Sequence, residues 1–96
     1  MALTDSDGAP LVLDVRTPDE FAAGHVPGAT NIPFDEIATH LAEVEPYRDR
    51  GVVVYCERGR RAGAAERELR AAGFGDVRQI EGHMSAWRAS NLPVEK

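Results

Sequence analysis

The chain has 96 residues, of which 43% are hydrophobic and 28% charged, and its 16 acidic and 11 basic residues give a formal net charge of −5. This length and composition predict one domain over residues 1–96 and exclude a disordered chain, a collagen-like repeat and a coiled coil. The acidic balance argues against nonspecific nucleic-acid or membrane partners, because both need a net basic surface. No apolar run approaches the roughly 20 residues of a membrane span, and Met1–Pro10 does not resemble a secretory signal, so we expect a cytoplasmic protein.

The first third of the chain alternates strand and helix signals. Leu11–Val15 is a nearly unbroken apolar run and predicts a short buried strand. A short helix is predicted over residues 17–24, because Thr17 and Glu20 have the spacing of a capping box at its start. After a loop containing proline and glycine, Ala29–Ile32 predicts a second short strand.

The middle of the chain predicts an amphipathic helix followed by a central strand. Within residues 35–44, Ile37, Leu41 and Val44 recur at spacings of four and three, which places them on one helical stripe. The β-branched run Val52–Tyr55 then predicts a strand in the centre of a sheet.

The last part of the chain predicts two further helices and one strand. Ala62–Ala72 carries apolar residues on one helical face, Val77–Ile80 predicts a fourth strand, and Met84–Arg88 marks a last short helix. Strands that alternate with helices predict βαβ units. We therefore expect an α/β fold with three layers, in which a mainly parallel sheet of about four to five strands is covered on both faces.

Cys56 is the only cysteine, which excludes an internal disulfide and a Cys-rich zinc site. It ends the central strand, and the segment between it and the next helix reads Glu57, Arg58, Gly59, Arg60 and Arg61. In open α/β sheets, sites gather at the carboxyl ends of strands, where backbone amides and a helix N-terminus can hold an anion. Such surroundings favour the thiolate, so Cys56 is a candidate nucleophile. The alternative is a small buried cysteine beside a solvated helix start.

Three segments of the chain resemble the rhodanese family of sulfurtransferases. They are LVLDVRTPDEFAAGHVPGATNIP at 11–33, VVVYCERGRRA at 52–62 and EGHMSAW at 81–87, and the resemblance extends over about Leu11 to Pro93. It implies a rhodanese-like fold, but the chain before Leu11 is too short for the strand and helix that usually begin this domain. The strand at Val77–Ile80 is therefore expected to be an exposed edge, open to pairing or covered by Met1–Pro10.

The resemblance also implies a reaction. Cys56 would accept sulfane sulfur from a small sulfur-containing anion such as thiosulfate, form a persulfide, and pass the sulfur to cyanide, a small thiol or a thiol protein. No metal or organic cofactor is expected. Of the basic residues, Arg58 and Arg60 would steer anions, whereas Arg61 would brace the loop as much as bind substrate.

Four further residues are expected to support the loop: Asp14, Arg16, Ala62 and His83. By resemblance, Asp14 accepts hydrogen bonds from loop amides or arginine, and Arg16 either pairs with a helix carboxylate or faces the pocket. The alternative is that these two residues only tie the strand to the helix. His83 stands where the family usually has a second glycine, so a positive φ would strain it. We expect it to narrow the pocket or to contact the acceptor.

The sequence leaves two alternatives to a sulfurtransferase. One is a sulfur-relay or regulatory interaction module with little turnover of its own. The other is a phosphatase or an arsenate reductase, whose related loops have the spacing Cys-x5-Arg. Here Arg61 gives Cys-x4-Arg, and Tyr55 stands where those phosphatases have histidine. The shorter loop favours sulfur chemistry. Outside the loop, we expect His25 to be a structural hydrogen-bonding residue and His40 a solvated one.

Overall fold

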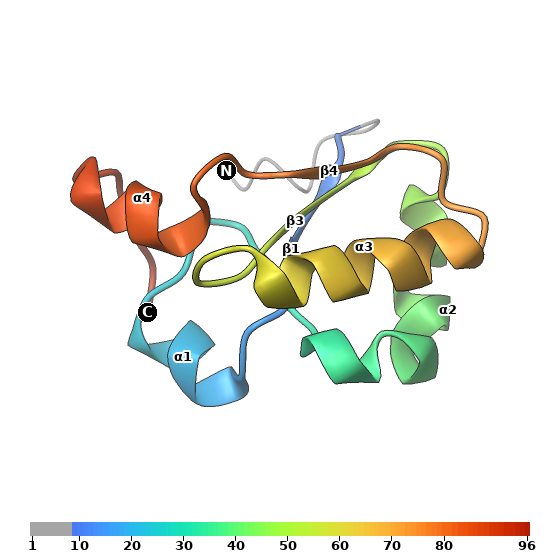
Figure 1. Cartoon of the computed structure of the whole chain (residues 1–96), viewed down its shortest axis with the longest axis horizontal. Coiled ribbons are helices and arrows are strands. Elements are labelled where there is room, and N and C mark those ends of the chain that lie inside the picture. Colours follow the sequence, from blue (N-terminus) through green and yellow to red (C-terminus); the bar gives the residue numbers. More distant parts are fainter. Residues whose placement is uncertain (1–8) are drawn as a thin grey trace.

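The computed structural model describes residues 9–96, and within them four parallel strands form one sheet with helices packed against it (Figure 1). The strands are β1 (Leu11–Asp14), β2 (Thr30–Asn31), β3 (Val52–Tyr55) and β4 (Val77–Gln79), in the order β2-β1-β3-β4. The helices are α1 (Pro18–Ala23), α2 (Leu41–Val44), α3 (Arg60–Ala71) and α4 (His83–Ala89), with 3-10 turns η2 (Phe34–Glu36), η3 (Ala38–His40) and η4 (Glu45–Tyr47). The predicted α/β class and parallel sheet are confirmed.

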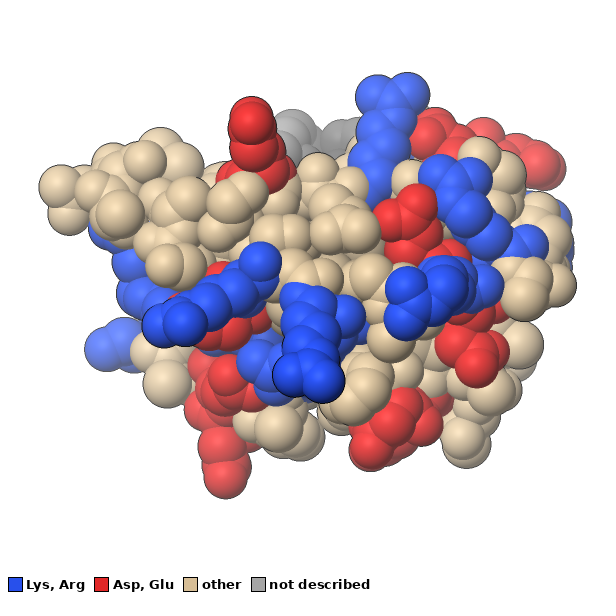
Figure 2. Space-filling view, viewed as in Figure 1, with Lys and Arg blue, Asp and Glu red and all other residues tan. Residues whose placement is uncertain are grey.

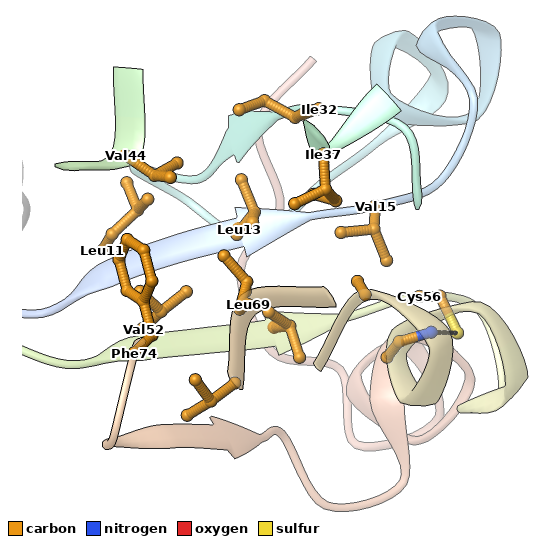
Figure 3. Packing of buried hydrophobic residues seen from close by; sticks show 14 residues of the cluster. Leu11, Leu13, Val15, Ile32, Ile37, Val44, Val52, Cys56, Leu69 and Phe74 are labelled. Carbon is orange, nitrogen blue, oxygen red and sulfur yellow. Dashed lines mark hydrogen bonds between the residues drawn. The ribbon is translucent and has the colours of Figure 1, made fainter. Parts of the chain in front are cut away.

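The main core lies between one face of the sheet and α3 together with the segment 34–47 (Figure 3). Alternate strand residues point into it, among them Leu13 and Val54, which are fully buried. Each such side chain contributes roughly 1.5–3 kcal/mol by leaving water. On the opposite face, a smaller cluster joins Tyr55 to Met84 of α4. Helices therefore pack on both faces, and α1 and α4 lie at the same end of the molecule (Figure 1).

The predicted single helix over residues 35–44 is wrong. The segment consists of short 3-10 turns and one turn of α-helix, and Ile37 lies between two of the 3-10 turns. The apolar spacing nevertheless has its expected effect, because Ile37 and Val44 are buried and Leu41 packs against the same core. So short a segment gains little from helix propagation, and packing of its apolar side chains decides the backbone path.

Several predicted boundaries shift by one or two residues. Val15 and Ile80 lie just outside β1 and β4, and β2 has two residues where four were expected. Helix α3 begins at Arg60, two residues earlier than predicted, so Arg60 and Arg61 belong to its first turn.

Strand β4 is an edge of the described sheet, as expected. The prediction that Met1–Pro10 covers this edge falls mostly on residues 1–8, outside the described part of the chain. Over residues 9–96, no helix is both long enough and apolar enough to cross a membrane. The cytoplasmic location stays a prediction.

Candidate active site

The register of the two central strands brings the predicted site residues together. Asp14 at the end of β1 is aligned with Tyr55 at the end of β3. Because the strands are parallel, Arg16 and Cys56 leave the same edge of the sheet. The loop from Cys56 to Gly59 then leads directly into α3. The structure thus places the Cys56 loop at the carboxyl end of an interior strand, as predicted.

Two backbone amides hold the sulfur of Cys56. The amide of Gly59 donates to Sγ at 2.9 Å. The amide of Ala62, in the first turn of α3, donates to the same atom at 3.4 Å, and Figure 3 draws this second bond as a dashed line. Donors aimed at one atom favour negative charge there, and the positive end of the α3 dipole acts in the same direction. The loop can therefore stabilise a thiolate or an anionic sulfur attached to Cys56.

Gly59 meets two requirements that other residues would not. Its φ of +121° lies in a region that side chains disfavour. A Cβ at this position would also lie 2.9 Å from Nε2 of His83. Glycine thus lets the loop turn back so that its own amide reaches Sγ.

Arg61 braces the loop against α1. Its guanidinium donates to both carboxylate oxygens of Glu20, at 2.6 and 3.0 Å. This pairing, together with hydrogen bonds from Thr17, lowers the pKa of Glu20 to about 2. The same Glu20 closes the predicted capping box with Thr17. One carboxylate therefore fixes both the start of α1 and the side chain of Arg61.

Asp14 and Arg16 form a buried pair behind the loop. Nη2 of Arg16 lies 2.8 Å from the Asp14 carboxylate and 2.7 Å from the carbonyl oxygen of Gly24, and Asp14 also accepts the Arg16 amide at 2.9 Å. Burial alone would lower the pKa of Arg16, but Asp14 raises it above its usual value, so the guanidinium stays charged. The predicted pairing of Arg16 with a helix carboxylate is wrong, because its main partners are Asp14 and Gly24, which tie the end of β1 to the end of α1 as the alternative predicted. Arg16 does not line the hollow at Cys56, but it lines another hollow together with Glu57.

The remaining loop residues divide into two kinds. Glu57 turns toward α4, where its carboxylate pairs with Arg88, and it also lies 3.5 Å from Nη1 of Arg16. Arg58 and Arg60 are exposed, and neither forms an ion pair with a residue of the described part. Their charges remain available to an incoming anion.

His83 lies against the loop rather than in the pocket. Its φ of +55° is left-handed, which is the condition under which the sequence predicts backbone strain, and only 7% of its surface is exposed. The amide of Cys56 donates to Nδ1 of His83 at 3.3 Å. Because Nδ1 accepts this bond, the ring is neutral with its proton on Nε2, and burial lowers the pKa of His83 below its usual value. The expectation that His83 narrows the pocket is wrong, since it does not line the hollow at Cys56.

We predict that His83→Asn makes stability less sensitive to acid. Asparagine tolerates the left-handed backbone and has an oxygen that can accept the Cys56 amide. In the wild type, the unfolded chain binds a proton at His83 more readily than the folded chain does. The stability that His83 contributes is therefore fully present above about pH 6.5 and lost as the pH falls toward its lower folded-state pKa.

Urea unfolding at about pH 8 and about pH 5 checks this prediction. The wild type should lose stability relative to His83→Asn at the lower pH. His25 and His40 are present in both proteins, so their own titration cancels in the comparison. A stability difference that stays constant with pH would show that His83 does not titrate against the loop.

A hollow of about 680 Å³ opens at Cys56. Its lining residues are Phe34, Cys56, Glu57, Arg58, Arg60, Arg61, Ala64 and Arg67. Phe34, Ala64 and Arg67 were not among the site residues predicted from the sequence. Arg60, Ala64 and Arg67 follow one another at spacings of four and three, so they form a helical stripe beside the buried one. This periodicity could have identified Ala64 and Arg67 from the sequence. The position of Phe34 beside them depends on how the chain folds, so the sequence pattern alone could not reveal it.

No cluster suited to a metal ion occurs within residues 9–96. His25 is structural, as expected: its Nδ1 lies 2.8 Å from the carbonyl oxygen of Phe21, and the two rings stack. His40 lies at the surface between Glu36 and Glu43, and these carboxylates raise the pKa of its imidazole.

The chain is similar to known proteins both in sequence and in structure. Residues 2–90 match the model of the rhodanese-like domain. A rhodanese-related protein from Thermoplasma volcanium has a similar structure, with a TM-score of 0.80 and 32% identity over 97% of this chain and 90% of that one.

Two curated relatives differ in what their names describe. A protein of Allochromatium vinosum named a sulfurtransferase is 37% identical over 84 residues, which cover 88% of this chain and 77% of the relative. An HTH-type transcriptional regulator of Mycobacterium tuberculosis is 42% identical over 92 residues, which cover 93% of this chain. The match spans only 39% of that regulator's length.

Proposed function

The chain belongs to the rhodanese-like domain family, and we propose that it is a sulfurtransferase that carries sulfane sulfur as a persulfide on Cys56. One observation supports this above all. In a loop with Cys-x4-Arg spacing, Sγ of Cys56 accepts the amides of Gly59 and Ala62, and Cys56 lines a hollow together with several arginines. Such a loop suits an anionic sulfur atom better than the larger oxyanion of a phosphatase.

The first half of the proposed reaction loads the cysteine. The Cys56 thiolate attacks the outer sulfur of thiosulfate and forms a new S–S bond, while the bond to the inner sulfur breaks and sulfite leaves with its electron pair. Arg58 and Arg60 draw the dianion toward the loop. The loop amides stabilise the terminal sulfur of the persulfide, which carries the negative charge.

The second half unloads the cysteine. Cyanide or a thiolate attacks the outer sulfur, the S–S bond to Cys56 breaks, and the Cys56 thiolate is restored. The products are thiocyanate or the persulfide of the acceptor. Cys56 carries one negative charge in both states, on Sγ as the thiolate and on the outer sulfur as the persulfide, so the loop holds an anionic sulfur throughout the cycle.

Intact mass spectrometry tests the proposal directly. The reduced protein is incubated with thiosulfate, desalted, weighed, and then treated with cyanide. We expect a gain of one sulfur atom that cyanide removes as thiocyanate. A folded, reduced protein that gains no sulfur would overturn the proposed activity.

The mycobacterial relative supports a second candidate. Because that protein is named a transcriptional regulator, this chain is also a candidate sulfur-relay or regulatory module with slow turnover. Such a module would form the persulfide but discharge it slowly to cyanide and rapidly to its own protein partner. The ratio of these two rates separates the two candidates.

A further inference from the structure

The hollow at Cys56 continues into a second hollow along α3. The second one has a volume of about 520 Å³, and it shares Phe34, Ala64 and Arg67 with the first. Its other lining residues are Asp35, Glu68 and Ala71. The two hollows therefore form one groove between α3 and η2, which we call the α3 groove.

The length of the α3 groove exceeds what a small sulfur donor or acceptor needs. Its lining runs from the first residue of α3, Arg60, to the last, Ala71. With about 1.5 Å of rise per residue, this helix is about 17 Å long. An extended peptide of about five residues has the same length, at about 3.3 Å per residue. Thiosulfate or cyanide fills only the end at Cys56.

Charge changes along the α3 groove. Near Cys56, Arg58 and Arg60 carry positive charge without an ion pair to the described residues, and Figure 2 shows Lys and Arg side chains gathered over the start of α3. At the far end, Asp35 and Glu68 are exposed and likewise form no ion pair within residues 9–96. The groove is thus basic beside the reactive sulfur, whereas at its other end the two carboxylates, Asp35 and Glu68, outnumber the one cation, Arg67. Phe34 supplies an apolar wall where the two parts meet.

We propose that the α3 groove binds an extended segment of an acceptor protein, with acidic residues next to its cysteine and a basic residue about four positions away. This inference rests on the proposed function. The acceptor cysteine loses its proton to solvent, and its thiolate attacks the outer sulfur of the Cys56 persulfide. The S–S bond to Cys56 breaks, and the acceptor leaves as a persulfide. The acidic residues face Arg58 and Arg60, and the basic residue faces Glu68.

Charge-matched peptides test the inference on the 96-residue chain. One synthetic peptide has two aspartates beside its cysteine and a lysine about four residues away, and a second has these charges exchanged. Each is made with the cysteine at either end, because the groove does not fix the direction of the bound segment. The protein is first loaded with thiosulfate, and transfer to each peptide is followed by mass. We expect the better matched peptide to react about tenfold faster than its charge-exchanged form.

Reversing the charge of Glu68, at the end of the α3 groove away from Cys56, tests whether the peptide preference arises there. Glu68→Lys should remove most of the preference for the peptide with lysine, and it should favour a peptide with glutamate at that position. Asp49→Lys is the matched control, because Asp49 is exposed and lies outside both hollows. It should leave the ratio between the peptides unchanged.

The outcomes separate the two proposals. If persulfide forms and cyanide discharges it, but all peptides react at the same rate, the groove inference is wrong and the sulfurtransferase stands. If peptide preference exists but survives Glu68→Lys, binding occurs elsewhere and the inference is again wrong. If no persulfide forms with thiosulfate, both proposals fail before any peptide is added.

Discussion

Replacing Cys56 by serine is expected to abolish sulfur transfer, with a residual rate below about one thousandth of the wild type. The serine hydroxyl stays protonated near neutral pH and cannot carry a sulfane sulfur. Its oxygen can still accept the amides of Gly59 and Ala62, so the loop should keep its path. Incubation with thiosulfate should therefore leave the mass of Cys56→Ser unchanged, although the protein remains folded.

Stability measured on the same variant distinguishes lost chemistry from lost structure. Cys56 is 1% exposed and packs in the main core, so an oxygen in place of sulfur should cost no more than about 1–2 kcal/mol of unfolding free energy. Circular dichroism and urea unfolding check this expectation. Sulfur gain by Cys56→Ser would show that the protein binds sulfur elsewhere, whereas a variant without a cooperative transition would call for Cys56→Ala instead.

The parts of the fold that sequence predicts well depend on short-range signals. The capping box of Thr17 and Glu20 involves residues three apart, and both of its hydrogen bonds are present. The β-branched run Val52–Tyr55 forms the expected strand, and Cys56 directly follows it. In each case the physical cause lies within a few neighbouring residues, so the local pattern is sufficient.

The parts that sequence does not predict depend on contacts distant in the chain. Arg61 pairs with Glu20 across 41 residues, and the Cys56 amide reaches His83 across 27. The spacing within residues 35–44 indicates which side chains are buried, but the packing of Ile37 and Val44 decides that the backbone turns. The spacing of apolar residues identifies which face of a segment is buried. What that face packs against is decided only when the whole sheet has assembled.

Arg16→Met is expected to destabilise the protein by about 3–5 kcal/mol, a large part of the roughly 5–15 kcal/mol typical of a small domain. The substitution keeps much of the aliphatic volume but removes the charge that faces Asp14. The carboxylate of Asp14 is 0% exposed, so it would remain buried without its cation. The carbonyl of Gly24 would also lose its guanidinium donor. Urea unfolding of the single variant measures the loss.

The double variant Asp14→Asn with Arg16→Met separates the buried charge from the lost contacts. Neutralising both partners removes the unpaired charge, so the double variant should be more stable than Arg16→Met alone.

Arg78→Met is the matched control: Arg78 pairs with Asp76 at 3.0 Å, but both side chains are more than half exposed. That exposed pair should contribute less than about 1 kcal/mol. Equal losses for Arg16→Met and Arg78→Met would mean that burial does not set the strength of the Asp14 pair. A double variant less stable than Arg16→Met would mean that the unpaired charge of Asp14 is not what destabilises the single variant, because asparagine still has an oxygen that can accept the Arg16 amide.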